Sequence, residues 1–154
     1  MDTRMPVWDA RRPMLSTIAV GTDGSATAAK AVEVAAEMAQ RYDAKLVLIS
    51  AAQDSRQPVA RPGQSEEVQW ATNPDALMRE MLHRTEQDML ERKIDCTTLI
   101  DEGDPGEVLT RLAEECNADV LVIGNRGMHR RVLGSVPNTV THKAPCSVYV
   151  VKTT

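Results

Sequence analysis

Short apolar runs alternate along this chain with longer segments in which apolar residues recur every three or four positions. The short runs predict buried strands, which span residues 17–20, 46–51, 94–100, 120–124 and 147–152. The longer segments predict helices, which span residues 27–42, 74–92, 105–116 and 136–143. Strands that alternate with helices in this way indicate an α/β fold, an open and doubly wound parallel sheet with right-handed crossovers.

Local signals predict some helix ends and faces. Asp104 is a typical N-cap, Pro105 suits the first helical position, and Glu107 is placed to close a capping box. In the helix predicted over residues 74–92, one side is expected to pack inward, and it carries Leu77, Met81, Leu82, Thr85 and Met89.

The length of 154 residues fits one domain. Residues 1–15 lack a period and are predicted to form an N-terminal arm, which leaves residues 16–154 as the domain. Residues 53–73 read as a polar loop that exceeds the usual connection and could serve as a lid or interface. The apolar runs are far shorter than the roughly 20 residues that span a bilayer. With no secretory signal at the start, the expected compartment is the cytoplasm and no membrane contact is predicted.

Composition excludes several classes of function. The net charge of −4, with two Trp, two Tyr and no Phe, argues against a nucleic-acid binder. Three cysteines at wide spacings suggest buried thiols, not a disulfide framework or a zinc site. The three histidines are scattered without metal-ligand spacing, so no metal site is predicted in the protein itself.

Two loops compete for the ligand site, which in open α/β sheets lies beyond the carboxyl ends of the strands. Residues 21–25 follow the first predicted strand, and Gly124 and Gly127 follow the fourth. Gly134 and Ser135 then open a helix, whose first amides attract anions. The basic residues in 126–131 either attract an anionic ligand or form a solvated loop. Asp23 is either a turn residue of the first helix or an acceptor for ribose hydroxyls.

Several segments together resemble the universal stress proteins. They are residues 18–25 (IAVGTDGS), 118–127 (ADVLVIGNRG), 133–136 (LGSV) and 144–151 (APCSVYVV), and the similarity covers residues 17–152. The resemblance implies a five-stranded parallel sheet in the order 3-2-1-4-5, of the adenine nucleotide alpha hydrolase type, and a homodimer. One branch of the family also binds ATP, through Gly-x-x-Gly, nine residues, and then Gly-Ser or Gly-Thr.

Carried over by position, the resemblance implies a set of nucleotide-binding residues. They are Gly21, Thr22, Asp23, Ala51, Ile123, Gly124, Gly127, Gly134, Ser135, Val136 and Pro137. One departure from the family pattern is clear, because six residues instead of nine separate Gly127 from Gly134. The shorter loop leaves less room around a triphosphate, and we expect a weaker preference for ATP over AMP or cyclic AMP.

The predicted function is therefore adenine-nucleotide binding in stress response or signalling. ATP is the first candidate ligand, with Mg²⁺ beside it, and AMP and cyclic AMP are the others. No catalysis is predicted, since no nucleophile elbow occurs and Asp23 is the sole carboxylate placed near the expected phosphates. The last strand is expected at an exposed edge of the sheet, where it would pair two copies. The alternative is an interaction module of the same family that dimerises without a nucleotide.

Overall fold

A computed structural model of the chain describes residues 13–53, 74–125 and 133–152, and it confirms the predicted alternation of strands and helices. The elements in chain order are β1 (Thr17–Gly21), α1 (Ala26–Tyr42), β2 (Lys45–Ala52), α3 (Pro74–Glu91), β3 (Cys96–Glu102), α4 (Pro105–Glu115), β4 (Val120–Asn125), α5 (Ser135–Lys143) and β5 (Ser147–Lys152). The third strand starts two residues later than predicted. The backbone N–H of Ile94 donates to the carbonyl of Met89, 3.0 Å away, and Lys93 has a φ of 65°, so Ile94 closes the end of α3.

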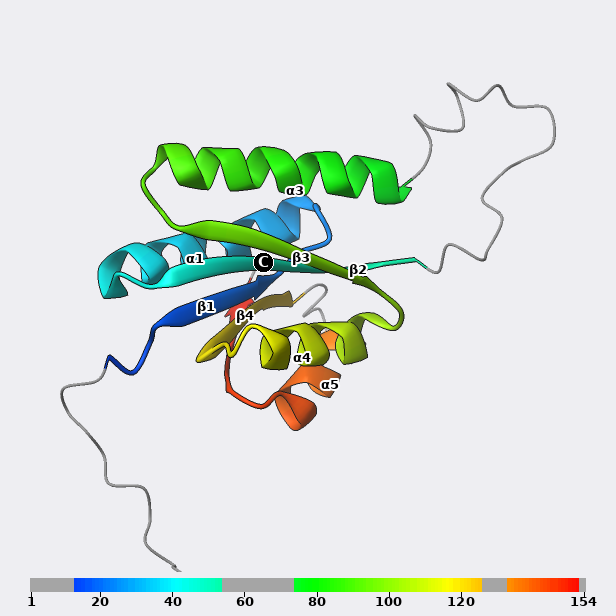
Figure 1. Cartoon of the computed structure of the whole chain (residues 1–154). Coiled ribbons are helices and arrows are strands. Elements are labelled where there is room, and N and C mark those ends of the chain that lie inside the picture. The colour runs from blue at the N-terminus through cyan, green and yellow to red at the C-terminus, as the bar shows by residue number, and fades with distance from the viewer. Residues whose placement is uncertain (1–12, 54–73, 126–132, 153–154) are drawn as a thin grey trace, which may run out of the picture.

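The five strands form one parallel sheet in the order β3-β2-β1-β4-β5, which confirms the expected topology and places β5 at an edge. Figure 1 shows three layers, with α1 and α3 on one face of the sheet and α4 and α5 on the other. In this order β2 lies on one side of β1, and β4 lies on the other side. This reversal of strand order opens a crevice beyond the carboxyl ends of β1 and β4.

Each face of the sheet carries its own apolar core, because successive side chains of a strand point to opposite faces. From β1, Ile18 and Val20 pack into the core beneath α1 and α3. The residue between them, Ala19, packs into the core beneath α4 and α5. The central strands are therefore buried on both faces, which explains why they read as continuous apolar runs in the sequence.

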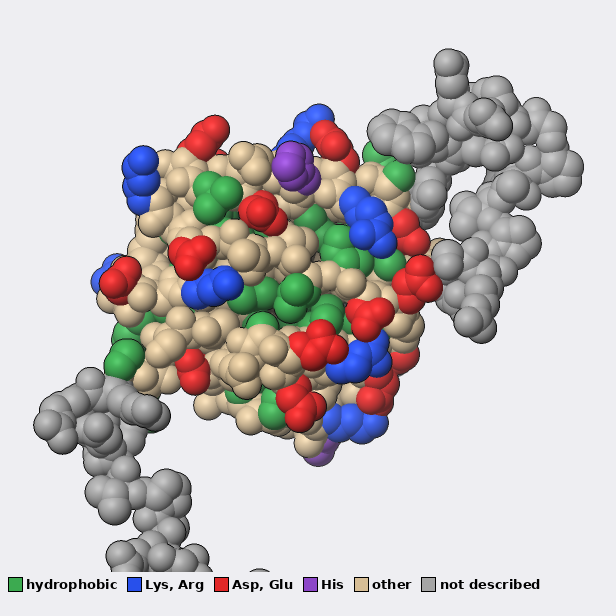
Figure 2. Space-filling view, viewed as in Figure 1, with side chains coloured by type: hydrophobic (Ala, Val, Ile, Leu, Met, Phe, Trp, Pro, Cys, Tyr) green, Lys and Arg blue, Asp and Glu red, His purple; other side chains and the backbone are tan. Residues whose placement is uncertain are grey.

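The inward side of α3 differs in part from the prediction. Leu82 and Met89 are buried as expected, but the third buried residue is Met78. Leu77 and Met81 are 51% and 45% exposed. Figure 2 shows hydrophobic side chains between charged ones on the face viewed there.

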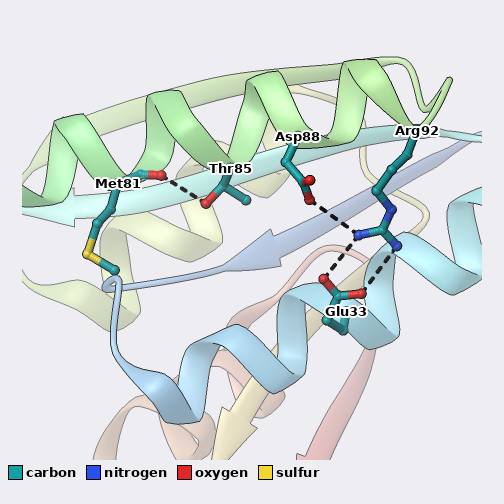
Figure 3. A network of polar contacts seen from close by, with 5 residues as sticks. All are labelled: Glu33, Met81, Thr85, Asp88 and Arg92. Atoms are coloured by element: carbon teal, nitrogen blue, oxygen red, sulfur yellow. Dashed lines mark hydrogen bonds and ion pairs between the residues drawn. The ribbon is translucent and has the colours of Figure 1, made fainter.

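A polar contact joins the carboxyl end of α3 to α1 (Figure 3). The Arg92 guanidinium donates to both carboxylate oxygens of Glu33, at 3.0 and 3.2 Å, and lies 3.5 Å from Asp88. The hydrogen bond to Glu33 is the main cause that raises the pKa of Arg92. Because Glu33 and Asp88 are largely exposed, such pairs contribute only about 0.2–1 kcal/mol each. The contact therefore adds little to the stability of the fold.

Other predictions have mixed outcomes. Cys96 is buried as expected, but Cys116 and Cys146 are only partly buried. Most of the predicted arm lies outside the described residues, as does nearly all of the predicted loop at 53–73; Leu15 of the arm packs against the core. Within the described part of the chain, no helix is long and apolar enough to cross a membrane.

Candidate functional site

A cavity of about 420 Å³ lies at the carboxyl ends of β1, β2 and β4, which places it in the crevice described above. This volume is within the range of small-molecule sites, roughly 300–1,000 Å³. The starts of α1, α4 and α5 also border the cavity. Its lining consists of Gly21, Thr22, Asp23, Ser25, Thr27, Ala28, Ser50, Ala51, Pro105, Leu109, Ile123, Gly124, Gly134, Ser135, Val136 and Pro137.

The structure brings the predicted site residues together in this one cavity. All of them line it except Gly127, which lies outside the described residues. They come from three strand ends and from the first turn of α5, which are far apart in the sequence. Their contact with a nucleotide stays a prediction.

The turn after β1 is held in place by its own hydrogen bonds. The carboxylate of Asp23 accepts from the backbone N–H of Ser25 at 2.9 Å, and the Ser25 hydroxyl accepts from that of Ala28 at 3.2 Å. Gly24 has a φ of +79°, which side chains rarely tolerate, and a β-carbon there would lie 3.0 Å from the sulfur of Met81. The turn reading of Asp23 is thus correct. The interpretation of Asp23 as an acceptor for ribose hydroxyls is still compatible with this turn, because a carboxylate has more than one acceptor site.

Ser50 supports this turn from below. Its hydroxyl donates to the carbonyl of Thr22 at 2.6 Å, and the side chain is 1% exposed. Sequence reasoning missed Ser50, although a hydroxyl inside an otherwise apolar strand was a usable signal. Five further cavity residues were not assigned to the site, although Ser25 stood in the candidate loop 21–25: Ser25, Thr27, Ala28, Pro105 and Leu109.

The three helix starts around the cavity differ in how their amides are satisfied. At the start of α1 the Ser25 side chain accepts from the backbone N–H of Ala28. At the start of α4 the Asp104 side chain accepts from the backbone N–H of Glu107 at 3.2 Å. In α5 the N-cap is Gly134, with no side-chain cap and no acidic residue in the first turn. The first amides of a helix have no partner within it, so those of Ser135 and Val136 are left for another acceptor. Pro137 has no N–H to offer.

The capping box predicted for α4 is only partly confirmed. Asp104 acts as the N-cap with Pro105 at the start of the helix. The Glu107 carboxylate, however, forms an ion pair with Lys143 at the end of α5. This pair links the two helices that cover one face of the sheet, and it raises the pKa of Lys143 mainly through the hydrogen bond to Glu107.

The described lining combines three kinds of surface. The apolar part comes from Ala51, Leu109 and Ile123, which suits a flat ring. Asp23 is the sole charged group of the described lining and suits hydroxyl donors. The start of α5 offers amides, the Ser135 hydroxyl and the positive end of a helix dipole, which together suit an anion. Ring, hydroxyls and anion are the parts of a nucleotide.

Comparison with known proteins decides the family. A model of the universal stress protein family matches residues 14–152. The chain belongs to this family. Universal stress protein MT1672 of Mycobacterium tuberculosis is 33% identical over 144 residues, which cover 90% of this chain and 97% of the relative.

Solved structures of universal stress proteins share the fold. One, solved in complex with cAMP, is 28% identical with a TM-score of 0.71, and the alignment covers 92% of this chain and 99% of that chain. Another, from Arabidopsis thaliana with AMP bound, has a TM-score of 0.69 at 21% identity, with coverage of 90% and 92%. At that lower identity the second likeness shows the fold alone.

No cluster of three or more metal-binding side chains occurs within the described residues of this universal stress protein. The described lining of the cavity contains one carboxylate, Asp23.

Proposed function

We propose that this chain binds an adenine nucleotide in the cavity between β1 and β4. In this assignment the amides of Ser135 and Val136 and the Ser135 hydroxyl hold a phosphate. Asp23 accepts from the ribose hydroxyls, and the apolar wall with Ala51 and Ile123 packs against the base. The observation that carries the proposal is that the start of α5, which has no side-chain cap, shares one cavity with Asp23.

The likeness to a universal stress protein solved with cAMP supports the adenine nucleotide as the ligand class. We propose ATP, accompanied by Mg²⁺, as one ligand and AMP and cyclic AMP as the others. The Gly127–Gly134 loop, with six residues between the two glycines in place of the family's nine, favours a weaker preference for ATP over AMP or cyclic AMP.

The proposed activity is binding without catalysis. Asp23 is the sole carboxylate of the described lining, and one of its oxygens already accepts from Ser25. It is therefore better suited to hold a ligand than to act as a general base.

Calorimetry with AMP, cyclic AMP and ATP with Mg²⁺ tests the proposal, with Asp23→Asn as the variant. The amide oxygen of Asn can still accept from Ser25, while the negative charge is lost. Hydrogen bonds to a charged group contribute about 1.5–3 kcal/mol, so we expect affinity to fall by at least tenfold with thermal stability unchanged. Asp95→Asn, at an exposed position outside the cavity, is the control. Absence of binding by wild-type protein to all three nucleotides would refute the proposal and favour the interaction module.

We also propose that two copies pair through β5. Within the described sheet this strand pairs with β4 alone, and Tyr149 on it is 50% exposed. An open strand edge with exposed apolar side chains is suited to an intermolecular contact. Light scattering at micromolar concentration should show a dimer that Val150→Pro converts to a monomer. A monomeric wild-type protein, or a dimer that the substitution leaves intact, would contradict the assignment.

A further inference from the structure

We infer that Asn125 is a positioning residue for the phosphate end of the cavity: its side chain holds Gly134 and so orients the first amides of α5. This inference rests on the proposed function, because it assigns a role within that binding site. Asn125 itself does not line the cavity, although its neighbour Gly124 does.

The contact joins a buried strand end to the residue that precedes α5. Asn125 is the last residue of β4 and is fully buried, at 0% exposure. Its side-chain oxygen accepts from the backbone N–H of Gly134 at 3.2 Å, across a separation of nine residues. The backbone of Asn125 is fixed in turn by pairing with Lys152 of β5. A rigid strand end thus holds the residue that precedes α5.

The contact with Asn125 restricts the backbone of Gly134, which has no side chain of its own to fix it. As the N-cap it makes no side-chain hydrogen bond, and glycine has more backbone freedom than other residues. When its N–H points toward Asn125, the carbonyl of Gly134 is free to start the helix and accepts from the N–H of Asn138 at 3.0 Å. The next amides, of Ser135 and Val136, then belong to the first turn of α5, where both residues line the cavity.

A neutral amide also suits this position better than its charged counterpart. Aspartate has nearly the same shape and would accept from Gly134 at least as well, so the contact alone does not require Asn. A carboxylate would, however, place a negative charge within hydrogen-bond distance of Gly134, beside the proposed phosphate. At a fully buried position water would screen this charge poorly, so its repulsion of a phosphate would be strong. Asn125→Asp therefore separates the hydrogen bond from the charge.

The readout is the ratio of the affinities for AMP and adenosine, because a merely structural defect would lower both. We expect Asn125→Asp to lower the affinity for AMP by at least tenfold and the affinity for adenosine by less than twofold. Both affinities are measured by calorimetry on the full chain. Asn125→Leu, which removes the acceptor, should also lower the ratio by at least threefold. The matched controls are Gln87→Glu and Gln87→Leu, at an exposed position of α3 outside the cavity lining, which should leave the ratio unchanged.

Hydrogen exchange of the Gly134 amide supplies a second measurement that does not depend on ligand. The amide should be protected in the wild type and in Asn125→Asp, and it should exchange faster in Asn125→Leu. If Asn125→Asp lowers the affinities for AMP and adenosine equally, or leaves the affinity for AMP unchanged, the inference is overturned. The proposed function would still hold in that case, provided that the wild-type protein binds a nucleotide. Wild-type protein that binds neither AMP nor adenosine would overturn the proposed function and this inference with it.

Discussion

Replacing Ser50 with alanine should loosen the turn that carries Asp23. The Ser50 hydroxyl has one proton and two neighbours, the Thr22 carbonyl at 2.6 Å and the Met78 sulfur at 3.0 Å. A carbonyl is the stronger acceptor, and 2.6 Å is a short O–H···O distance, so we place the proton on the bond to Thr22. Ser50→Ala removes this bond and leaves the Thr22 carbonyl in a buried place without the hydroxyl.

The size of the effect follows from burial. Ser50 is 1% exposed and Thr22 is 9% exposed, so water cannot easily replace the lost donor. A buried polar group that loses its partner costs about 1–3 kcal/mol, whereas the hydrogen bond alone contributes about 0.5–1.5 kcal/mol net. We therefore expect the free energy of unfolding to fall by about 1–3 kcal/mol. The affinity for AMP should fall as well, because Thr22 and Asp23 are neighbours in the cavity wall.

Urea unfolding followed by circular dichroism measures the stability, and calorimetry measures the affinity. Ser16→Ala is a matched control, because Ser16 is exposed and its hydroxyl lies 3.5 Å from the carbonyl of Pro13. Exposed substitutions of this kind usually change stability by less than about 0.5 kcal/mol. If Ser50→Ala unfolds at the same urea concentration as Ser16→Ala, the buried bond does not support the turn and the reasoning fails.

Two further predictions use pKa shifts. The hydrogen bond from Arg111, at 2.7 Å, is the main cause that lowers the pKa of Asp101. A carboxyl group whose pKa is lower in the folded state stabilises the protein above its unfolded pKa of about 3.9, and this contribution is lost as the pH falls through the folded pKa. Arg111→Gln should therefore be less stable than wild type at pH 6, with a smaller difference at pH 3; a constant difference would contradict this assignment. Burial raises the pKa of the Cys96 thiol to about 12. In the folded protein at pH 8.5, iodoacetamide should therefore modify Cys96 more slowly than Cys116 and Cys146, as counted by mass spectrometry. Equal rates would show that burial does not protect Cys96.

The strand and helix order could be predicted in large part because β1, β2 and β4 are mostly continuous apolar runs. That pattern arises where both faces of a strand are covered, as for Val47 and Leu48, which face opposite cores. The inward side of α3 was harder to predict. Leu77 and Met78 are adjacent and equally apolar, and only the packing against β2 and β3 buries one of them. The ion pair of the Glu107 carboxylate could not be predicted for a similar reason, because its partner Lys143 lies on another helix.

The candidate site was predictable where a motif marks it and unpredictable where support comes from beneath. Glycines and Asp23 stand in recognisable turns after strands, so sequence alone located them. Ser50 lies in no motif, and Asn125 occupies one of the two positions that the Gly-x-x-Gly motif leaves unspecified. Each is a polar residue at or near the end of a buried strand, and its importance depends on a contact with Thr22 or Gly134 that only the fold creates.

These two contacts suggest why the cavity can present opposite chemistries a short distance apart. Ser50 fixes the turn of β1, which carries the acidic Asp23, and Asn125 fixes the start of α5, which carries amides without an acidic cap. Both supporting side chains are neutral and buried, so neither adds charge to the cavity. An acidic end suited to hydroxyl donors and an amide end suited to an anion are thereby kept distinct. A ligand with ribose and phosphate would satisfy both ends at once, whereas adenosine would satisfy only one.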